Sequence, residues 1–313
     1  MSNISLQTKN APSSQRHIIS ELVTGRLIPG PIWRKREYRL KFLLRSLLFW
    51  PSTVRMLDAL SRRPGFDAQL QAQVTLPSKS HLQYLTLELS ASQRADAIIS
   101  HYDWLDNHLS KRAADAVTAT RPQQILRFTG KDGAEFAVFA SGAHKAEREG
   151  ESTLWFYDGN NALLASVTFS VTTENGERAL VIGGLQGPRK NVTHDVIKVA
   201  TKACYGIFPK RLLLETLWQM CASTGINAVY GVSDNGHVFR ALRYRLSKGR
   251  HFHASYDEFW SSIDGVKSDN YRWRLPLHMA RKPLEEIASK KRAEYRRRFQ
   301  LLDEIHASLN NYF

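Results

Sequence analysis

Five short β-rich runs in the middle of the chain decide its fold. They are QQILRF (123–128), AEFAVFA (134–140), TLWFY (153–157), ALLASVTF (162–169) and ALVIGGL (179–185). Turn sequences separate several of the runs, namely KDG (131–133), DGNN (158–161) and ENG (174–176). Asp-Gly and Asn-Gly between β-rich runs are strong hairpin signals, because tight hairpin turns need residues that tolerate positive φ. The pattern predicts an antiparallel meander of four to five strands over residues 123–186.

Helical patterns lie on both sides of this meander. Pro51 and Pro209 stand where helices begin, while Gly206 and Gly225 stand where helices end. A further strand is expected at 226–232, after the second helical pair. This order predicts an α+β fold with a central, mostly antiparallel sheet flanked by helices. The expected helical ranges are 34–50, 51–60, 91–111, 193–205, 209–223, 255–262 and 283–309.

The domain organisation follows from these patterns. We expect a flexible leader at 1–25, a basic helical region at 26–120 and an α+β core at 121–280. A basic C-terminal helix at 281–313 is expected to pack on the core. The longest apolar stretch near the N-terminus, residues 40–50, is interrupted by basic residues and is shorter than the roughly 20 residues of a membrane span. No transmembrane segment is therefore expected.

The net charge of +15 is the one extreme property of the composition. Residues 26–63 hold ten basic and two acidic residues, and residues 272–298 hold ten basic and three acidic residues. The intervening residues 64–271 hold 22 basic and 21 acidic residues. The positive charge therefore belongs to two flanking segments, and the expected core is nearly neutral.

Two amphipathic basic segments predict an anionic partner, either a membrane surface or a phosphorylated ligand. The alternative is a solvated face on which Lys and Arg stems cover apolar surface. Nucleic acid is disfavoured, because the chain lacks zinc-finger spacing and an RNA-binding consensus. Two cysteines, Cys204 and Cys221, are too few for a disulfide scaffold, which favours a cytoplasmic location, with the inner membrane surface as an alternative.

The window that follows the last run of the meander is the first candidate binding site. Glycines between a strand and a helix allow backbone amides to approach an anion. On this reading Gln186, Gly187, Arg189 and Lys190 face a phosphorylated cofactor. The alternative is a bulged strand end followed by a tight turn.

Further candidates come from the next helices and strand. Lys202 and Lys210 are phosphate-binding candidates, with ordinary helix-surface lysines as the alternative. His237 is the candidate general base and Asp234 the residue that orients it, with a purely structural turn as the alternative. His251 and His253 would lie on one strand face with Asp257 and Glu258 nearby, but a metal site needs a third ligand at suitable geometry, so no metal site is predicted.

Several motifs together resemble the VirK/YbjX family of Gram-negative bacteria. The resemblance covers most of the chain from about 35 to 305. Its motifs are HLQYL (81–85), HY (101–102), GLQG (184–187), TK (201–202), YG (205–206), PK (209–210), GVS (231–233), His237, YD (256–257), FW (259–260), SKKRA (289–293) and YRR (295–297).

The resemblance implies links to virulence, envelope remodelling, stress responses and resistance to cationic antimicrobial peptides. It supplies no catalytic residues. The element order is also similar to that of the GNAT fold, in which the helix after the fourth strand receives the pyrophosphate of an acyl-CoA. In that comparison Gln186, Arg189 and Lys190 approach the pyrophosphate, although the loop here does not follow the usual GNAT glycine pattern.

Two functions therefore remain open, together with a disfavoured third. One is a GNAT-like acyltransferase that uses acyl-CoA. Another is a non-enzymatic peripheral membrane or adaptor protein that binds anionic lipid through its basic helices. The third is a nucleic-acid binder, which the neutral core disfavours.

Overall fold

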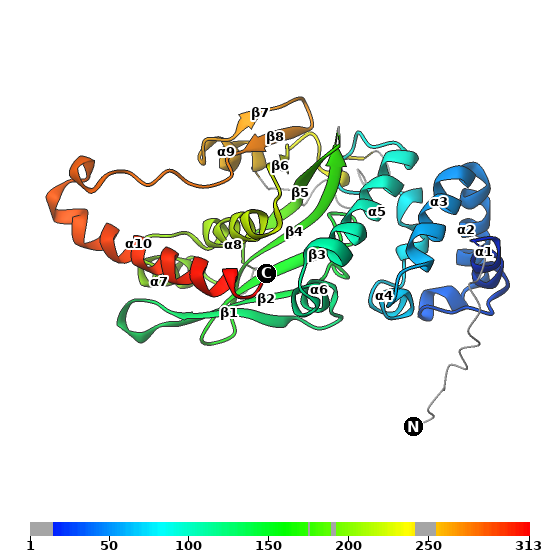
Figure 1. Ribbon diagram of the computed structural model, residues 1–313, viewed down its shortest axis with the longest axis horizontal. Coiled ribbons are helices and arrows are strands. Elements are labelled where there is room, and N and C mark those ends of the chain that lie inside the picture. Colours follow the sequence, from blue (N-terminus) through cyan, green and yellow to red (C-terminus); the bar gives the residue numbers. More distant parts are fainter. Residues whose placement is uncertain (1–14, 175, 189–191, 242–254) are drawn as a thin grey trace, which may run out of the picture.

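A computed structural model of the chain describes residues 15–174, 176–188, 192–241 and 255–313 (Figure 1). The strands are β1 (Gln123–Thr129), β2 (Glu135–Gly142), β3 (Ser152–Asp158), β4 (Leu163–Glu174), β5 (Glu177–Gln186), β6 (Ala228–Val232), β7 (Val266–Lys267) and β8 (Arg272–Leu275). The helices are α1 (Gln15–Thr24), α2 (Arg36–Leu48), α3 (Trp50–Ser61), α4 (Phe66–Ala72), α5 (Ala91–His108), α6 (Lys111–Thr118), α7 (His194–Ala203), α8 (Pro209–Thr224), α9 (Tyr256–Ser261) and α10 (Ser289–Asn310).

The strands form one sheet in the order β1-β2-β3-β4-β5-β6-β8-β7. Strands β1 to β5 are the predicted meander, and each pairs antiparallel with the next. Figure 1 shows helices lying against the sheet, with α1 to α4 grouped at one end of the molecule. The predicted α+β class, with a central, mostly antiparallel sheet flanked by helices, is confirmed.

One strand pair departs from the antiparallel pattern. Strands β5 and β6 are parallel, and their register runs from the pair Ala179–Ala228 to the pair Ile182–Gly231. Parallel neighbours need a crossover connection, which α7 and α8 provide here. Beyond Ile182, strand β5 continues to Gln186 without further pairing to β6. The two strands therefore part at the end that carries the candidate site.

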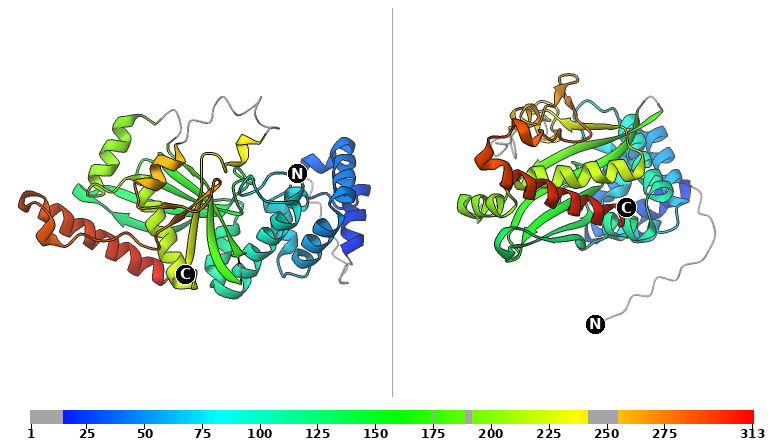
Figure 2. Two further views of the ribbon diagram at one scale, coloured as in Figure 1. Left: turned by 90° about the horizontal axis from the view of Figure 1, so that it is seen from above. Right: turned by 60° about the vertical axis from the view of Figure 1, so that its left-hand side comes forward.

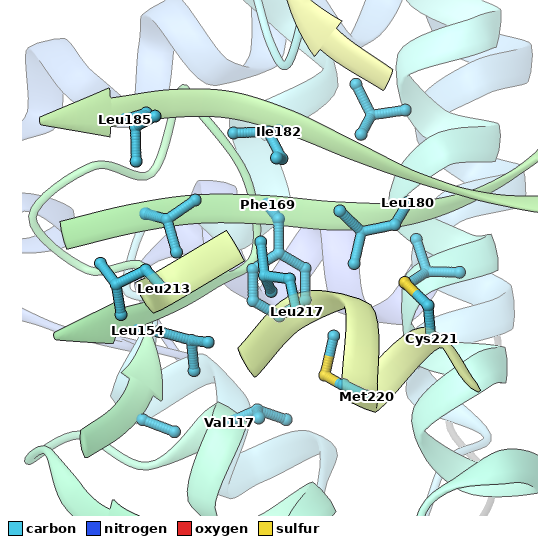
Figure 3. Packing of buried hydrophobic residues seen from close by; sticks show 14 of the residues in the cluster. Val117, Leu154, Phe169, Leu180, Ile182, Leu185, Leu213, Leu217, Met220 and Cys221 are labelled. Carbon is cyan, nitrogen blue, oxygen red and sulfur yellow. The ribbon is translucent and has the colours of Figure 1, made fainter. Parts of the chain in front are cut away.

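A β-bulge lies in the part of β5 that pairs with β4 but not with β6. Thr168 pairs with Gly184 and Phe169 pairs with Ile182, so Gly183 is an extra residue in the ladder. The bulge keeps Leu185 on the side of Ile182, where both pack toward α8 (Figure 3). The bulged strand end foreseen as the alternative reading of this window is thus present.

Strand β4 has an apolar and a polar side, and both are covered. Phe169 lies among α8 side chains such as Leu213, Leu217 and Met220 on the apolar side (Figure 3). Ser170 on the polar side is buried and hydrogen-bonded to the Tyr84 hydroxyl, at 2.7 Å between the oxygens. The polar side therefore holds buried hydrogen-bonding groups that an all-apolar core does not.

Some elements differ from the sequence expectation. The last helix begins at Ser289 rather than Pro283, because Ile287 is extended and Ala288 is also non-helical, which separates the helix from a short 3-10 turn, η7 (Leu284–Glu286). Helix α4 and the 3-10 turn η2 (Leu76–His81) lie between the expected helical ranges 51–60 and 91–111, where no helix was expected. The expected ends at Pro209 and Gly225 are confirmed, and Gly225 has a left-handed φ of 68°.

Candidate functional sites

The outer face of α2 combines exposed leucines with basic residues. Leu40, Leu44, Leu47 and Leu48 are between 56% and 73% exposed on helix α2. Their spacing places them on one face, because residues three, four and seven apart lie above one another on a helix. Trp50, at the start of α3, is also exposed.

Cations border these leucines. Arg34, Lys35, Arg36 and Lys41 are exposed, and Glu37 is the acidic residue among them. The opposite side of α2 is buried through Phe42 and Ser46. We refer to Arg34, Lys35, Arg36, Leu40, Lys41, Leu44, Leu47, Leu48 and Trp50 as the α2 face.

The second basic segment lies far from the α2 face. Figures 1 and 2 show α2 at one end of the molecule and the N-terminal half of α10 at the other. Two α10 arginines are used within the chain, since Arg292 donates to the carbonyls of Ile287 and Glu285 and Arg298 donates to that of Tyr205. Helix α10 contributes none of the exposed large apolar side chains of the described residues. The two segments are thus different kinds of surface.

Two of the predicted site residues, Gln186 and His237, lie beside a carboxylate that the sequence analysis missed. Glu149, in the loop between β2 and β3, is 2% exposed at its side chain. Its Oε2 accepts a hydrogen bond from Gln186 Nε2 at 3.3 Å, and its Oε1 lies 3.3 Å from His237 Nε2. Both distances are long for hydrogen bonds, so this is a loose cluster rather than a tight dyad.

The His237 ring has contacts at both nitrogens. The backbone amide of Phe239 donates to His237 Nδ1 at 3.3 Å, and Nε2 faces Glu149. The ring stacks on Tyr256, with 5.4 Å between the centroids. The Tyr256 hydroxyl accepts from the Leu185 amide at 3.2 Å. Burial raises the pKa of Tyr256, and the nearby Glu149 carboxylate raises it further.

Asp234 makes its described contacts with α9. Its carboxylate accepts from the Tyr256 amide at 2.8 Å, while its own amide donates to Asp257 at 2.9 Å. Asp234 therefore holds the start of α9, and with it the Tyr256 ring that stacks on His237. The acid that faces His237 directly is Glu149.

Lys210 and Gly187 lie together, whereas Lys202 lies elsewhere. A Cβ at Gly187 would be 3.8 Å from Lys210 Cε. Lys210 is half-buried in the first turn of α8, with Nζ 5.4 Å from the Phe259 ring centroid, and burial lowers its pKa. Lys202 is exposed in the last turn of α7.

The remaining residues named from the sequence either lie outside the described residues or are buried cysteines. Arg189, Lys190, His251 and His253 lie outside the described residues. Cys204 and Cys221 are free and buried, and burial raises the pKa of the Cys204 thiol to about 12. A thiol held protonated in this way is a poor nucleophile.

A second buried carboxylate, Glu151, lies two residues after Glu149. Its Oε1 is 2.6 Å from Lys79 Nζ, and neither side chain is more than 1% exposed. The Tyr102 hydroxyl donates to Glu151 Oε2 at 3.0 Å, and Lys79 also donates to Gln73 Oε1. Burial lowers the pKa of Lys79, which the carboxylate opposes.

Gly150 joins the two clusters. A Cβ at this position would lie 2.5 Å from the Phe169 carbonyl oxygen, so only glycine fits between the strand and the loop. Glu149 then meets Gln186, His237 and Tyr256, while Glu151 meets Lys79 and Tyr102. Several motifs that carry the family resemblance therefore converge on residues 149–151. The signal available in the sequence was the charged run EREGE (147–151) directly before a strand.

Among the residues that the structure describes, no helix is both long and apolar enough to cross a membrane. Within the same residues, no group of three or more His, Cys, Asp or Glu side chains is arranged to hold a metal ion.

Comparisons with known proteins find a matching family model and several relatives. A family model described as "Protein of unknown function (DUF535)" matches residues 31–311. A protein of Escherichia coli K12, named Uncharacterized protein YbjX, is 37% identical over 306 residues, which cover 98% of this chain and 92% of that protein. A Haemophilus influenzae protein is 34% identical over 275 residues, covering 88% and 90%. Membrane protein LapB of Mannheimia haemolytica is 23% identical over 201 residues, covering 63% and 85%.

Proposed function

This chain belongs to the VirK/YbjX family, and from that starting point we propose that it is a peripheral protein that docks on anionic membrane through its α2 face. One observation carries the proposal. Four leucines are more than half exposed on one side of a helix whose other side is buried, and cations border them. Amphipathic helices that lie in a membrane interface have this composition.

The energetics favour a reversible association. Burial of a leucine side chain contributes on the order of 1.5–3 kcal/mol when it is complete, so partial insertion of four leucines contributes several kcal/mol. Each Lys or Arg near an anionic lipid surface adds about 1 kcal/mol. The exposed Glu37 subtracts from this sum, and so does the loss of freedom on docking.

Lipid suits this face better than nucleic acid does. Leucines occupy the middle of the α2 face and cations occupy its borders, whereas nucleic-acid surfaces present cations to phosphates throughout. The name of the Mannheimia haemolytica relative, Membrane protein LapB, supports a membrane context. We place the docked protein at the cytoplasmic side of the inner membrane, which suits the two free cysteines and the envelope links that the family resemblance implies.

Vesicle co-sedimentation tests the proposal. The protein should sediment with vesicles of phosphatidylcholine and phosphatidylglycerol and should remain in solution with phosphatidylcholine alone. High salt should weaken binding, because it screens the charge contribution. Equal sedimentation with both kinds of vesicle, or with neither, would count against docking on anionic lipid.

Two matched pairs of variants locate the surface. The variant Leu44→Glu should weaken binding strongly, while Val199→Glu, at a 67% exposed position of α7, should keep it. The charge reversal Arg36→Glu/Lys41→Glu should weaken binding strongly, whereas Arg296→Glu/Arg297→Glu in α10 should weaken it less. If the α10 pair has the larger effect, the docking surface is not the α2 face.

Acyl transfer is a second candidate, which a specific observation favours. The parallel strands β5 and β6, joined by α7 and α8, part beyond Ile182 and Gly231, and β5 is bulged at Gly183. This arrangement is similar to the element order expected from the GNAT comparison. Lys210, in the first turn of α8, lies beside Gly187, and on this second proposal Gln186, Gly187 and Lys210 would hold the phosphates of an acyl-CoA.

These residues suit the phosphates of an acyl-CoA, but the part of β5 next to them is already covered by other side chains. Lys210 offers a cation beside the backbone of Gly187, which suits a phosphate. Along β5 itself, however, Glu149 packs on Gly183 and Gly184, and the Leu185 amide is bonded to the Tyr256 hydroxyl. We therefore assign no transfer step to these residues.

Calorimetry with acetyl-CoA and palmitoyl-CoA tests this second candidate. Saturable binding of either compound to the folded chain would support it. Absence of binding would exclude it, and the membrane proposal would be unaffected because it rests on a different surface.

A further inference from the structure

The N-terminal half of α10 is a surface of a different kind from the α2 face. Figures 1 and 2 show this half at the end of the molecule opposite α2, where it extends beyond the sheet. The C-terminal half of the helix packs on the core through buried Leu301, Leu302, Ile305 and Leu309. From Ser289 to Arg297, in contrast, every residue is exposed except the half-buried Arg292 and Tyr295. This half of the helix therefore faces solvent rather than the core.

Positive charge is concentrated on this exposed half. Residues 289–298 hold six basic residues and one acidic residue, Glu294. Arg292 and Arg298 are held by backbone carbonyls of the chain itself. Four cations remain that make no hydrogen bond or ion pair within the part of the chain that the structure describes, namely Lys290, Lys291, Arg296 and Arg297. We refer to these four residues as the α10 cations.

Helix stability does not explain where these charges lie. The first turn of α10 contains Lys290 and Lys291 and no acidic residue. The amino end of a helix carries the positive end of the macrodipole, so cations are unfavourable there and carboxylates are favourable. The two lysines therefore weaken the helix slightly, and an anionic partner would offset this effect.

The α10 cations lie on more than one side of the helix. Lys290 and Arg297 are seven residues apart and share a side, because successive residues are rotated by about 100°. Arg296 lies about 120° from Lys290 around the helix axis, and Lys291 lies about 140° from Arg296. The charge therefore surrounds this half of the helix instead of forming one stripe.

This arrangement suits DNA better than a lipid surface. A membrane meets a helix along one side and takes up its apolar side chains, but residues 289–297, all of which the structure describes, expose no large apolar side chain. The major groove of DNA has a phosphate backbone along each edge, so a helix lying in it meets anions on two sides.

We propose that the N-terminal half of α10 binds duplex DNA, seated in the major groove with the α10 cations against the phosphates of both strands. A helix with its side chains is about 10–12 Å in diameter, and the major groove is about 12 Å wide. Residues 289–297 extend over about 14 Å, which spans roughly four base pairs. Phosphate contacts carry no sequence information, so the binding needs no base-reading motif. It also concerns a surface away from the nearly neutral core.

Fluorescence anisotropy of the full chain with a labelled DNA duplex of arbitrary sequence tests the proposal, over about 50–200 mM salt. The wild type should bind the duplex, and its affinity should fall steeply as salt rises, because each phosphate contact releases counterions. The variant Lys290→Gln/Lys291→Gln/Arg296→Gln/Arg297→Gln should bind at least about tenfold more weakly at the lowest salt. Its plot of log affinity against log salt should also be shallower by about 3, since each lost phosphate contact removes about 0.9 from the slope.

The α2 face supplies a control of equal charge. The variant Arg34→Gln/Lys35→Gln/Arg36→Gln/Lys41→Gln removes four exposed cations at the other end of the molecule and should leave the DNA affinity nearly unchanged. The same variant should lose vesicle binding if the α2 face docks on membrane, whereas the α10 variant should keep most of it. The two proposals can therefore fail separately.

Thermal melts of both variants show whether they fold. The α10 variant should melt no lower than the wild type, because the replaced side chains make no hydrogen bond or ion pair within the described residues. If it melts lower, Lys290→Gln/Lys291→Gln and Arg296→Gln/Arg297→Gln, measured separately, replace it. The proposal is overturned if the folded wild type does not bind the duplex at low salt, or if the α10 and α2 variants weaken binding alike. Equal competition by polyglutamate and by unlabelled duplex would also overturn it, because the helix would then attract any polyanion.

Discussion

Lys79 and Glu151 form a buried ion pair, with 2.6 Å between Nζ and Oε1 and at most 1% of either side chain exposed. The pair joins the η2 turn of the helical N-terminal region to the edge of β3. Gln73, Tyr102 and the Gly150 carbonyl complete its hydrogen bonds. Such a pair contributes little net stability by itself, but removal of one partner leaves an uncompensated buried charge.

Loss of Lys79 alone should therefore destabilise the chain strongly. We expect Lys79→Met to lower the free energy of unfolding by about 3–5 kcal/mol, because Glu151 is then buried without its counter-ion. The double variant Lys79→Met/Glu151→Gln should recover part of the loss. Urea denaturation measures both values, and strictly additive effects would show that the two side chains do not interact.

Gly183, in the β-bulge, should tolerate substitution less well than Gly187, which follows the end of β5. Gly183→Ala places a Cβ 2.0 Å from the Glu149 carbonyl oxygen, so either β5 or the Glu149 loop must move. We expect a loss of about 2 kcal/mol in unfolding free energy. Gly187→Ala is the matched control, because a Cβ at Gly187 would lie 3.8 Å from Cε of Lys210, which is a flexible side chain. Equal melting temperatures for the two variants would contradict the close approach at Gly183.

Stability should fall at mildly acidic pH because of His81. Its Nε2 bonds to Thr53 Oγ1 at 2.8 Å, and burial together with nearby arginines lowers its pKa to about 4. The unfolded state, with a histidine pKa near 6.5, takes up the proton first as the pH falls. This histidine should therefore cost about 2 kcal/mol of stability between pH 7 and pH 5.

The variant His81→Gln isolates that contribution. It should show a shallower loss of unfolding free energy between pH 7 and pH 5 than the wild type, since other titrating groups act equally in both chains. Parallel pH profiles for the two proteins would mean that His81 protonates alike in the folded and unfolded states.

The two candidate lysines should differ if a phosphorylated donor binds. Lys210 lies beside Gly187 at the start of α8, whereas Lys202 is exposed at the end of α7. For any acyl-CoA that binds, Lys210→Met should raise the dissociation constant about tenfold, and Lys202→Met should leave it nearly unchanged. Calorimetry on both variants checks this, and the reverse order would move the phosphate site to α7.

The sheet could be predicted because its signals are local. Alternating runs separated by Asp-Gly and Asn-Gly turns specify a meander, and Pro209 and Gly225 mark both ends of α8. The start of α10 was misplaced because Pro283 is an equally good start for the short 3-10 turn that precedes it. A proline marks where a helical turn begins, but it does not show whether that turn continues into a long helix.

The candidate site was only partly predictable. His237 and Gln186 are candidates because of their positions after strands, and both lie near Glu149, which no local signal connects to them since its loop is far from both in sequence. The parallel pairing of β5 and β6 and the burial of the pair Lys79–Glu151 depend on the same long-range contacts. The sequence also did not predict that the α2 leucines are exposed, because a helical leucine pattern normally indicates a buried face.

The most direct test of the docking account is the environment of residue 44 on a membrane. The native cysteines are buried, so an environment-sensitive fluorophore can be attached selectively to Leu44→Cys, with Val199→Cys as the comparison. We predict a blue shift of the emission at position 44, and none at position 199, when vesicles containing phosphatidylglycerol are added. No shift at position 44, or equal shifts at both positions, would contradict docking through the α2 face.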